Sequence, residues 1–267
     1  MMPTRRLVAG AAVLLIAATG TACGHRTTGR AAAPAASASL PASASAPAST
    51  TSNDALGADD LAARAKYAMG RLSSVTVDGT IHVDQEEMTI HLTADRDKNC
   101  QGTVALGSIG EVEVRHTGSH TWIKPDARFW TSIAAEQGAG SSGQAVAEVF
   151  KGRYLTGGED DANLKEVSEM CGLIEGITDG DLAPDAVKAG TGTVNGTRTV
   201  NLQTTDGDGT HSTLYIAAEG EPYVVRMESP EQGRVDFSAF DVPFTVQAPP
   251  ADAVIDYTAF QQKAKTV

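Results

Sequence analysis

The chain has 267 residues, of which 41% are hydrophobic and 5% aromatic, and its formal net charge is −12 at pH 7. Once the N-terminal segments described below are set aside, roughly 200 residues remain, enough for one domain with a core of mainly aliphatic side chains. The acidic balance repels nucleic acid and anionic lipid surfaces, so it excludes nucleic acid as a partner and favours apolar contacts with any ligand.

Residues 1–22 predict a signal peptide. Arg5 and Arg6 precede an apolar run over residues 7–18, which has the length of a signal-peptide core and is too short to span a membrane. Small residues then lead into Cys23, a pattern that resembles the cleavage site of bacterial lipoproteins, although Gly20 stands where these usually have leucine. We expect Cys23 to accept diacylglycerol, with palmitate among its acyl chains. The alternative is an ordinary secretory signal with an incidental cysteine.

Residues 23–53 predict a disordered tether behind this anchor. The segment consists largely of Ala, Ser, Pro and Thr, and prolines at positions 34, 41 and 47 interrupt any helix that the alanines would start. A flexible coil of about 30 residues has a reach on the order of 30 Å. Because no later segment approaches the ~20 apolar residues of a membrane span, we expect a domain at the extracytoplasmic face of the cell membrane, attached only through its lipid.

The folded domain, expected over residues 54–247, begins with a helix and continues with strands. Apolar residues recur at helical spacing from Ala58 to Leu72, with Asp59 and Asp60 in the first turn, where the helix dipole favours them. Alternation of apolar and polar residues then predicts half-buried strands over residues 75–83, 88–94, 103–106, 111–116 and 120–124. Residues 84–87 fit a hairpin turn.

Helical segments follow over residues 144–150 and along a stripe from Leu164 to Ile174, after which alternation returns. The later strands are expected over residues 191–194, 197–203, 211–217, 222–228 and 234–240, with residues 248–267 as a loosely packed C-terminal tail. This order predicts an α+β fold, in which a large curved antiparallel sheet forms a half-barrel wrapped around a few helices.

Two cysteines remain in the expected domain, Cys100 and Cys171. An even pair in an oxidising compartment predicts a disulfide, which would close a loop of about 70 residues. Two free buried thiols or a redox pair are the alternatives, but the sequence contains no Cys-x-x-Cys motif.

Taken together, these features resemble the actinobacterial LppX/LprAFG-like lipoproteins, whose domain is similar to that of the lipoprotein carrier LolA. The resemblance spans roughly residues 58–240. It rests on features of that span, namely the helix that leads into Ser74-Val75-Thr76-Val77-Asp78-Gly79, the strand Thr121-Trp122-Ile123-Lys124 and the central helices, and also on the lipidation site and the tether that precede it. It implies a curved half-barrel closed by helices, with an apolar cavity for acyl chains, in a family whose members carry or present lipids and lipoglycans.

We therefore expect a lipid or another amphipathic molecule to bind between the sheet and the helices. The candidate lining residues are Val77, Ile81, Ile90, Leu92, Leu106, Val114, Trp122, Leu164 and Val167. Trp122 and Trp130 are equally compatible with a cavity wall and with ordinary core. The rival interpretation is a solid-core module that binds an envelope protein or senses a signal, with an exposed apolar patch in place of an internal one.

No motif indicates an enzyme. The chain has neither a Gly-x-Ser-x-Gly elbow nor a His-Glu-x-x-His pair, and acidic pairs such as Glu86-Glu87 lie in expected turns. We accordingly predict no catalytic residues, no metal site and no cofactor.

Overall fold

The computed structural model describes residues 52–83, 86–118, 120–136, 142–157, 162–178, 182–205 and 209–259. The predicted signal peptide, the lipidation site at Cys23, nearly all of the predicted tether, and Asp84 and Gln85 of the first hairpin turn lie outside the described residues.

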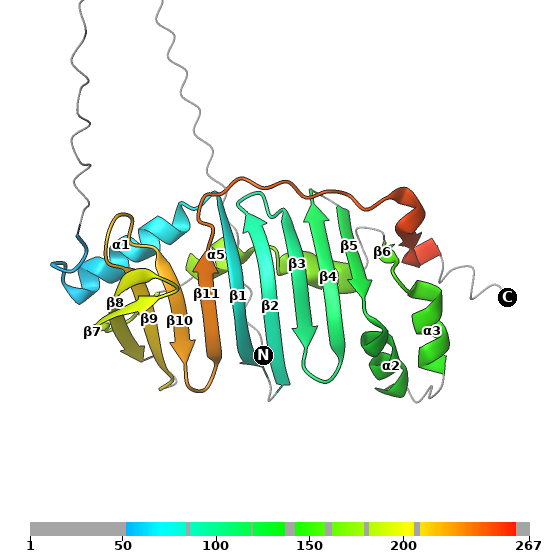
Figure 1. The fold of residues 1–267 in the computed structure, drawn as a ribbon, viewed down its shortest axis with the longest axis horizontal. Coiled ribbons are helices and arrows are strands. Elements are labelled where there is room, and N and C mark those ends of the chain that lie inside the picture. The colour runs from blue at the N-terminus through cyan, green and yellow to red at the C-terminus, as the bar shows by residue number, and fades with distance from the viewer. Residues whose placement is uncertain are drawn as a thin grey trace, which may run out of the picture. The chain divides into compact units, whose positions relative to one another are not determined.

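One twelve-stranded sheet dominates the described part of the chain, in the order β12-β6-β5-β4-β3-β2-β1-β11-β10-β9-β8-β7 (Figure 1). Its first half runs as consecutive antiparallel strands: β1 (Ser74–Val83), β2 (Glu86–Asp95), β3 (Cys100–Leu106), β4 (Gly110–Thr117) and β5 (His120–Pro125). The second half comprises β7 (Val187–Val194), β8 (Thr197–Thr205), β9 (His211–Ala217), β10 (Val224–Ser229) and β11 (Gly233–Ser238). Antiparallel pairing of β1 with β11 joins the halves. The sheet is open and curved, which confirms the predicted α+β class and half-barrel.

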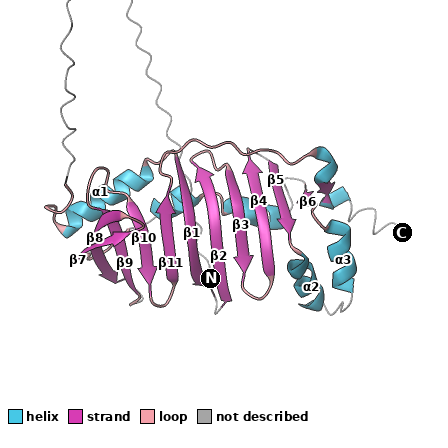
Figure 2. Cartoon of the chain, in the orientation of Figure 1, coloured by secondary structure: helices cyan, strands magenta, loops and turns pink. Residues whose placement is uncertain are grey.

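The first helix is where the apolar spacing predicts it. In α1 (Ala58–Gly70), Leu61, Ala65 and Met69 repeat every four residues and are fully buried. Figure 2 shows α1 behind the strands, on one face of the sheet. Its apolar stripe packs with strands of the second half and with β1 in the larger of the core clusters.

The central helices differ from the expectation in number and place. The single stripe from Leu164 to Ile174 forms two helices, α4 (Ala162–Glu169) and α5 (Leu173–Thr178), separated by a turn in which the Gly172 N–H donates to the Glu169 carbonyl at 3.1 Å. The expected helix after residue 143 is α3 (Ser142–Phe150). An additional helix, α2 (Ala127–Glu136), begins where Asp126 accepts the Phe129 N–H at 2.7 Å, a local cap after Pro125 that the spacing argument overlooked.

Strand register separates two faces of the sheet. Val77 lies opposite Leu92 and Phe237, Leu92 lies opposite Gly102, and these positions face the helices. We call this face the inner face. Neighbouring positions point the other way, and there polar pairs replace apolar contacts, as where the hydroxyls of Thr76 and Thr93 lie 2.8 Å apart. We call this the outer face.

Residues 260–267 of the expected tail lie outside the described residues, and the segment that follows β11 is described as far as residue 259. It runs along the ends of the first five strands to the far edge of the sheet (Figure 1). Arg115 donates to the Gln247 carbonyl at 3.0 Å, and β12 (Val254–Asp256), preceded by the short 3₁₀ helix Ala251–Ala253, pairs in parallel with β6 (Tyr154–Thr156). Three-residue strands that pair across about 100 positions leave no periodic pattern in the sequence.

Among the described residues, no helix combines the length and the apolar character needed to cross a membrane.

Candidate functional site

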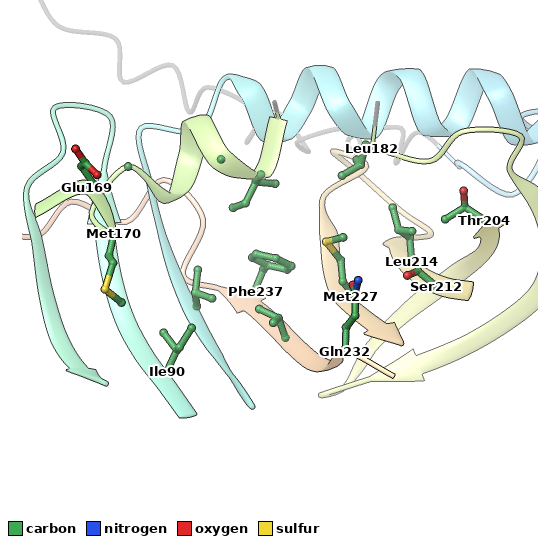
Figure 3. Close-up of a pocket in the computed structure, with 15 residues that line it drawn as sticks. Ile90, Glu169, Met170, Leu182, Thr204, Ser212, Leu214, Met227, Gln232 and Phe237 are labelled. Atoms are coloured by element: carbon green, nitrogen blue, oxygen red, sulfur yellow. The ribbon is translucent and has the colours of Figure 1, made fainter. Parts of the chain in front are cut away.

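A cavity of about 550 Å³ lies between the inner face of the sheet and the segment that carries α4 and α5 (Figure 3). Residues from six strands, from the turn after β10 and from the helical segment surround it. Its lining consists of Val77, Ile90, Glu169, Met170, Gly172, Gly176, Ile177, Leu182, Thr204, Ser212, Leu214, Met227, Gln232, Val235 and Phe237. We call this space the inner cavity.

The register of the strands brings the cavity floor together. Phe237 lies opposite Val77, and Val235 lies opposite Met227, which in turn faces Leu214 across the next pair of strands. Because alternate residues of a strand point to the same face, these five apolar side chains form one continuous surface. The floor therefore joins strands from both halves of the chain.

The roof is the turn between α4 and α5, and a disulfide holds it in place. Met170 and Gly172 line the cavity, and Cys171 between them is bonded to Cys100 of β3, with a Cα–Cα distance of 5.4 Å. Both cysteines are completely buried. The predicted disulfide thus ties the helical wall of the cavity to the sheet.

Polar groups are few and lie at the margins of the cavity. Figure 3 shows Glu169 on one side and Thr204 with Ser212 on the other. The Thr204 hydroxyl donates to the Pro184 carbonyl, and Glu169 is the one ionisable side chain among the described lining residues. This arrangement can solvate a polar end of a ligand, while the middle of the cavity offers mainly apolar surface.

Two of the predicted lining residues, Val77 and Ile90, reach this cavity. Leu92 and Val114 belong instead to a packed cluster around the disulfide, against which Val167 also packs. Leu164 is buried on α4. On the inner face, Ile81 and Leu106 are half-buried but lie outside the lining.

Trp122 lies on the outer face and thus away from the inner cavity. It pairs with Arg115, whereas its neighbour Ile123 pairs with Val114 on the inner face. Its ring stacks on His120, with centroids 5.8 Å apart. The prediction that Trp122 lines the cavity is therefore wrong for the inner cavity, because the alternation along its own strand puts the side chain on the opposite face.

The lining residues that come from the second half of the sheet were not among the predicted ones. Leu214, Met227, Val235 and Phe237 follow the same alternation as Val77 and Ile90, so a search of the later strands for apolar inward positions would have found them. Within the segments that the structure describes, no three His, Cys, Asp or Glu side chains are grouped so that they could hold a metal ion.

No protein-family model matches the sequence, and no curated protein matches it. In fold, the chain is similar to the solved structures of LprF from Mycobacterium bovis and of the lipoprotein LppX from Mycobacterium tuberculosis. LprF shares 15% identity at a TM-score of 0.49, over 73% of this chain and 97% of its own. LppX shares 14% identity at a TM-score of 0.39, over 71% and 99%. MucB in the Pseudomonas aeruginosa MucA/MucB complex shares 14% identity at a TM-score of 0.29, over 73% and 59%.

Proposed function

We propose that this protein is a membrane-anchored, extracytoplasmic lipoprotein that binds the acyl part of a lipid or another amphipathic molecule in its inner cavity. The observation that carries the proposal is the cavity of about 550 Å³ with a continuous apolar floor. Its volume falls within the range of roughly 300–1,000 Å³ typical of small-molecule sites. The anchor would be the lipid on Cys23.

Apolar burial would supply the affinity. Each methylene group moved from water into the cavity contributes about 0.8 kcal/mol, so eight methylenes contribute about 6 kcal/mol before the cost of immobilising the chain. Met170 and Met227 suit this role because unbranched thioether side chains adapt to chains of different shape.

The margins of the cavity favour an uncharged or cationic polar end. The Ser212 and Thr204 hydroxyls and the Gln232 amide are neutral, and the carboxylate of Glu169 repels an anion. A neutral glycerolipid would bring no anionic group beside Glu169, and a zwitterionic lysolipid would bring no net charge.

The rival interpretation, a solid-core module with an exposed apolar patch, has less support. The most exposed large apolar side chains in the described segments are Tyr67, Val149, Val187 and Val242. They come from α1, α3, β7 and the segment after β11, respectively, and so from four separate elements.

Gly176 offers a direct test. It lines the cavity from α5, and a Cβ atom built on it meets no atom within 4 Å apart from those of its own helix. The Gly176→Trp variant should therefore fill the mouth of the cavity, whereas Gly176→Ala should leave it open. Both substitutions favour the helix over glycine, so stability alone should not separate them.

The assay is titration of the full-length protein, purified in detergent and then exchanged into buffer, with a fluorescent NBD-labelled lysophosphatidylcholine. Native mass spectrometry of the same samples would detect lipid that co-purifies. We expect saturable binding to the wild type and to Gly176→Ala, weakened about tenfold or more in Gly176→Trp. The absence of both co-purified lipid and probe binding in the wild type would refute the proposal.

A further inference from the structure

A second cleft, of about 320 Å³, lies on the other side of the sheet, where α2 and α3 meet the outer face of β3, β4 and β5. It shares no lining residue with the inner cavity. Its lining consists of Thr103, Glu111, Glu113, Lys124, Pro125, Asp126, Ala127, Trp130, Ala147, Glu148, Lys151 and Gly152. We call it the outer cleft.

Strand register builds the floor of the outer cleft. Thr103 lies opposite Glu113, which lies opposite Lys124, so these three side chains form a row across neighbouring strands. The flanking Val114 and Ile123 point to the inner face. The row therefore points away from the inner cavity and toward the wall made by the two helices.

A preorganised ionic network holds the centre of the floor. Glu113 accepts hydrogen bonds from Tyr154 at 2.5 Å and from Arg115 at 2.9 Å, and it forms an ion pair with Lys124. Both cationic groups lie over the ring of Tyr154, 4.9 and 4.8 Å from its centroid. Partial burial raises the pKa of Glu113, but the hydrogen bonds from Lys124, Tyr154 and Arg115 bring it below its usual value. The carboxylate thus stays charged, with two cations beside it.

The rest of the cleft combines an apolar surface with a rim of donors and acceptors. Pro125, Ala127 and Trp130 supply the apolar part. At the rim, the carboxylate of Glu111 is exposed, and Lys151 pairs with Glu148 at 3.4 Å with both side chains largely in solvent. The charged side chains bring more negative than positive charge to the cleft, which disfavours an anionic ligand. The two ammonium groups, of Lys124 and Lys151, are already paired with Glu113 and Glu148.

Uncharged polyols match this mixture. A sugar ring has an apolar C–H face that can lie on an indole or a proline ring, and each hydroxyl group can both donate and accept a hydrogen bond. Such a ligand can satisfy carboxylates and ammonium groups together without bringing a charge into the cleft. We propose that the outer cleft binds one ring of a neutral saccharide, so that the domain can hold a glycan on one face of its sheet independently of any lipid on the other.

Ala127 allows the outer cleft to be closed without disturbing the core. It is exposed at the start of α2 and lines the cleft, so Ala127→Trp should occupy the space that a sugar ring needs. The matched control is Ala63→Trp, at an exposed position of α1 that lines neither the outer cleft nor the inner cavity. Lys151→Ala is a second, milder variant, because Lys151 is largely solvent-exposed.

The experiment is saturation-transfer NMR and calorimetric titration of the full-length protein with D-glucose, D-mannose, D-galactose and N-acetyl-D-glucosamine. D-glucosamine and D-glucuronate serve as the cationic and anionic comparisons. We expect at least one neutral sugar to bind with a Kd on the order of 1 mM. Binding should weaken about tenfold in Ala127→Trp and about threefold in Lys151→Ala, and remain unchanged in Ala63→Trp.

Three results would overturn the proposal: no binding of any neutral sugar, tighter binding of a charged sugar than of its neutral counterpart, or equal binding by Ala127→Trp and the wild type. The NBD-lysolipid titration on the same variants separates this proposal from the function of the inner cavity, because Ala127→Trp should leave that titration unchanged.

Discussion

Removal of the disulfide should cost this domain much of its stability. Cys100 and Cys171 are 71 residues apart in the sequence, and cross-linking a loop of that length removes enough unfolded-state entropy to stabilise the native state by about 4 kcal/mol. For a domain of roughly 200 residues, each kcal/mol shifts the thermal midpoint by about 2–4 °C. The Cys100→Ala/Cys171→Ala double variant should therefore melt about 8–16 °C below the wild type.

The assay is thermal and urea unfolding followed by circular dichroism at pH 7 without reductant. Wild-type protein treated with dithiothreitol should match the double variant, and the double variant itself should not respond to dithiothreitol. A double variant that melts within about 2 °C of the wild type would refute the loop-entropy reasoning.

The disulfide should also affect how long a ligand stays bound. Glu169, Met170 and Gly172 flank Cys171 and line the inner cavity, so an unlinked roof can separate from the sheet more easily. If the proposed lipid binding holds, the dissociation rate of the NBD-lysolipid in stopped-flow displacement should rise in the double variant. Equal rates in the two proteins would show that the roof stays in place without the bond.

Three further predictions address other parts of the chain. Asn53 is buried, and its Nδ2 donates to the carbonyls of Ala217 at 2.9 Å and Gly220 at 3.2 Å. In urea titrations, Asn53→Ala should therefore lower the free energy of unfolding by about 1–3 kcal/mol, and a change near zero would contradict this prediction. The Arg226 hydrogen bonds lower the pKa of Asp236, so this carboxylate stabilises the fold above its unfolded pKa of about 4 and loses that contribution as the pH falls through its lowered native pKa. The difference in unfolding free energy between the wild type and Asp236→Asn should therefore be largest near pH 7 and should shrink in acid. A difference that does not depend on pH would contradict this prediction. Cys23→Ser should move the protein from the membrane fraction to the soluble fraction on cell fractionation if Cys23 carries the anchor, whereas unchanged membrane association would point to another mode of attachment.

Local patterns were sufficient to predict most of the architecture. The period of two in β1, β2 and β4 and the period near four in α1 follow from burying one face of each element, and a residue's own neighbours reveal that face. The elements that escaped prediction are α2, β6 and β12. The strands among them are three residues long, and their pairing partners lie far away in the chain, so no local period marks them.

The inner cavity depends on contacts between distant parts of the chain. Val77 and Phe237 lie side by side across 160 positions, and only the β1–β11 pairing brings them together. Alternation shows that each faces inward, but not whether a helix fills the space above it. For Leu92 and Val114 the space is filled, because the disulfide draws Cys171 onto β3 beside them.

The amino-acid sequence by itself determined the class of fold, the inward face of most strands, the first helix and the identity of the two cysteines that pair. These features depend on spacing within short segments, where side-chain direction repeats with a known period. Only the tertiary structure decided that an open space remains under α4 and α5, and that α2 and α3 form a second cleft with the other side of the sheet. The physical reason is that a cavity is a property of close packing between elements, and close packing depends on long-range register rather than on local pattern.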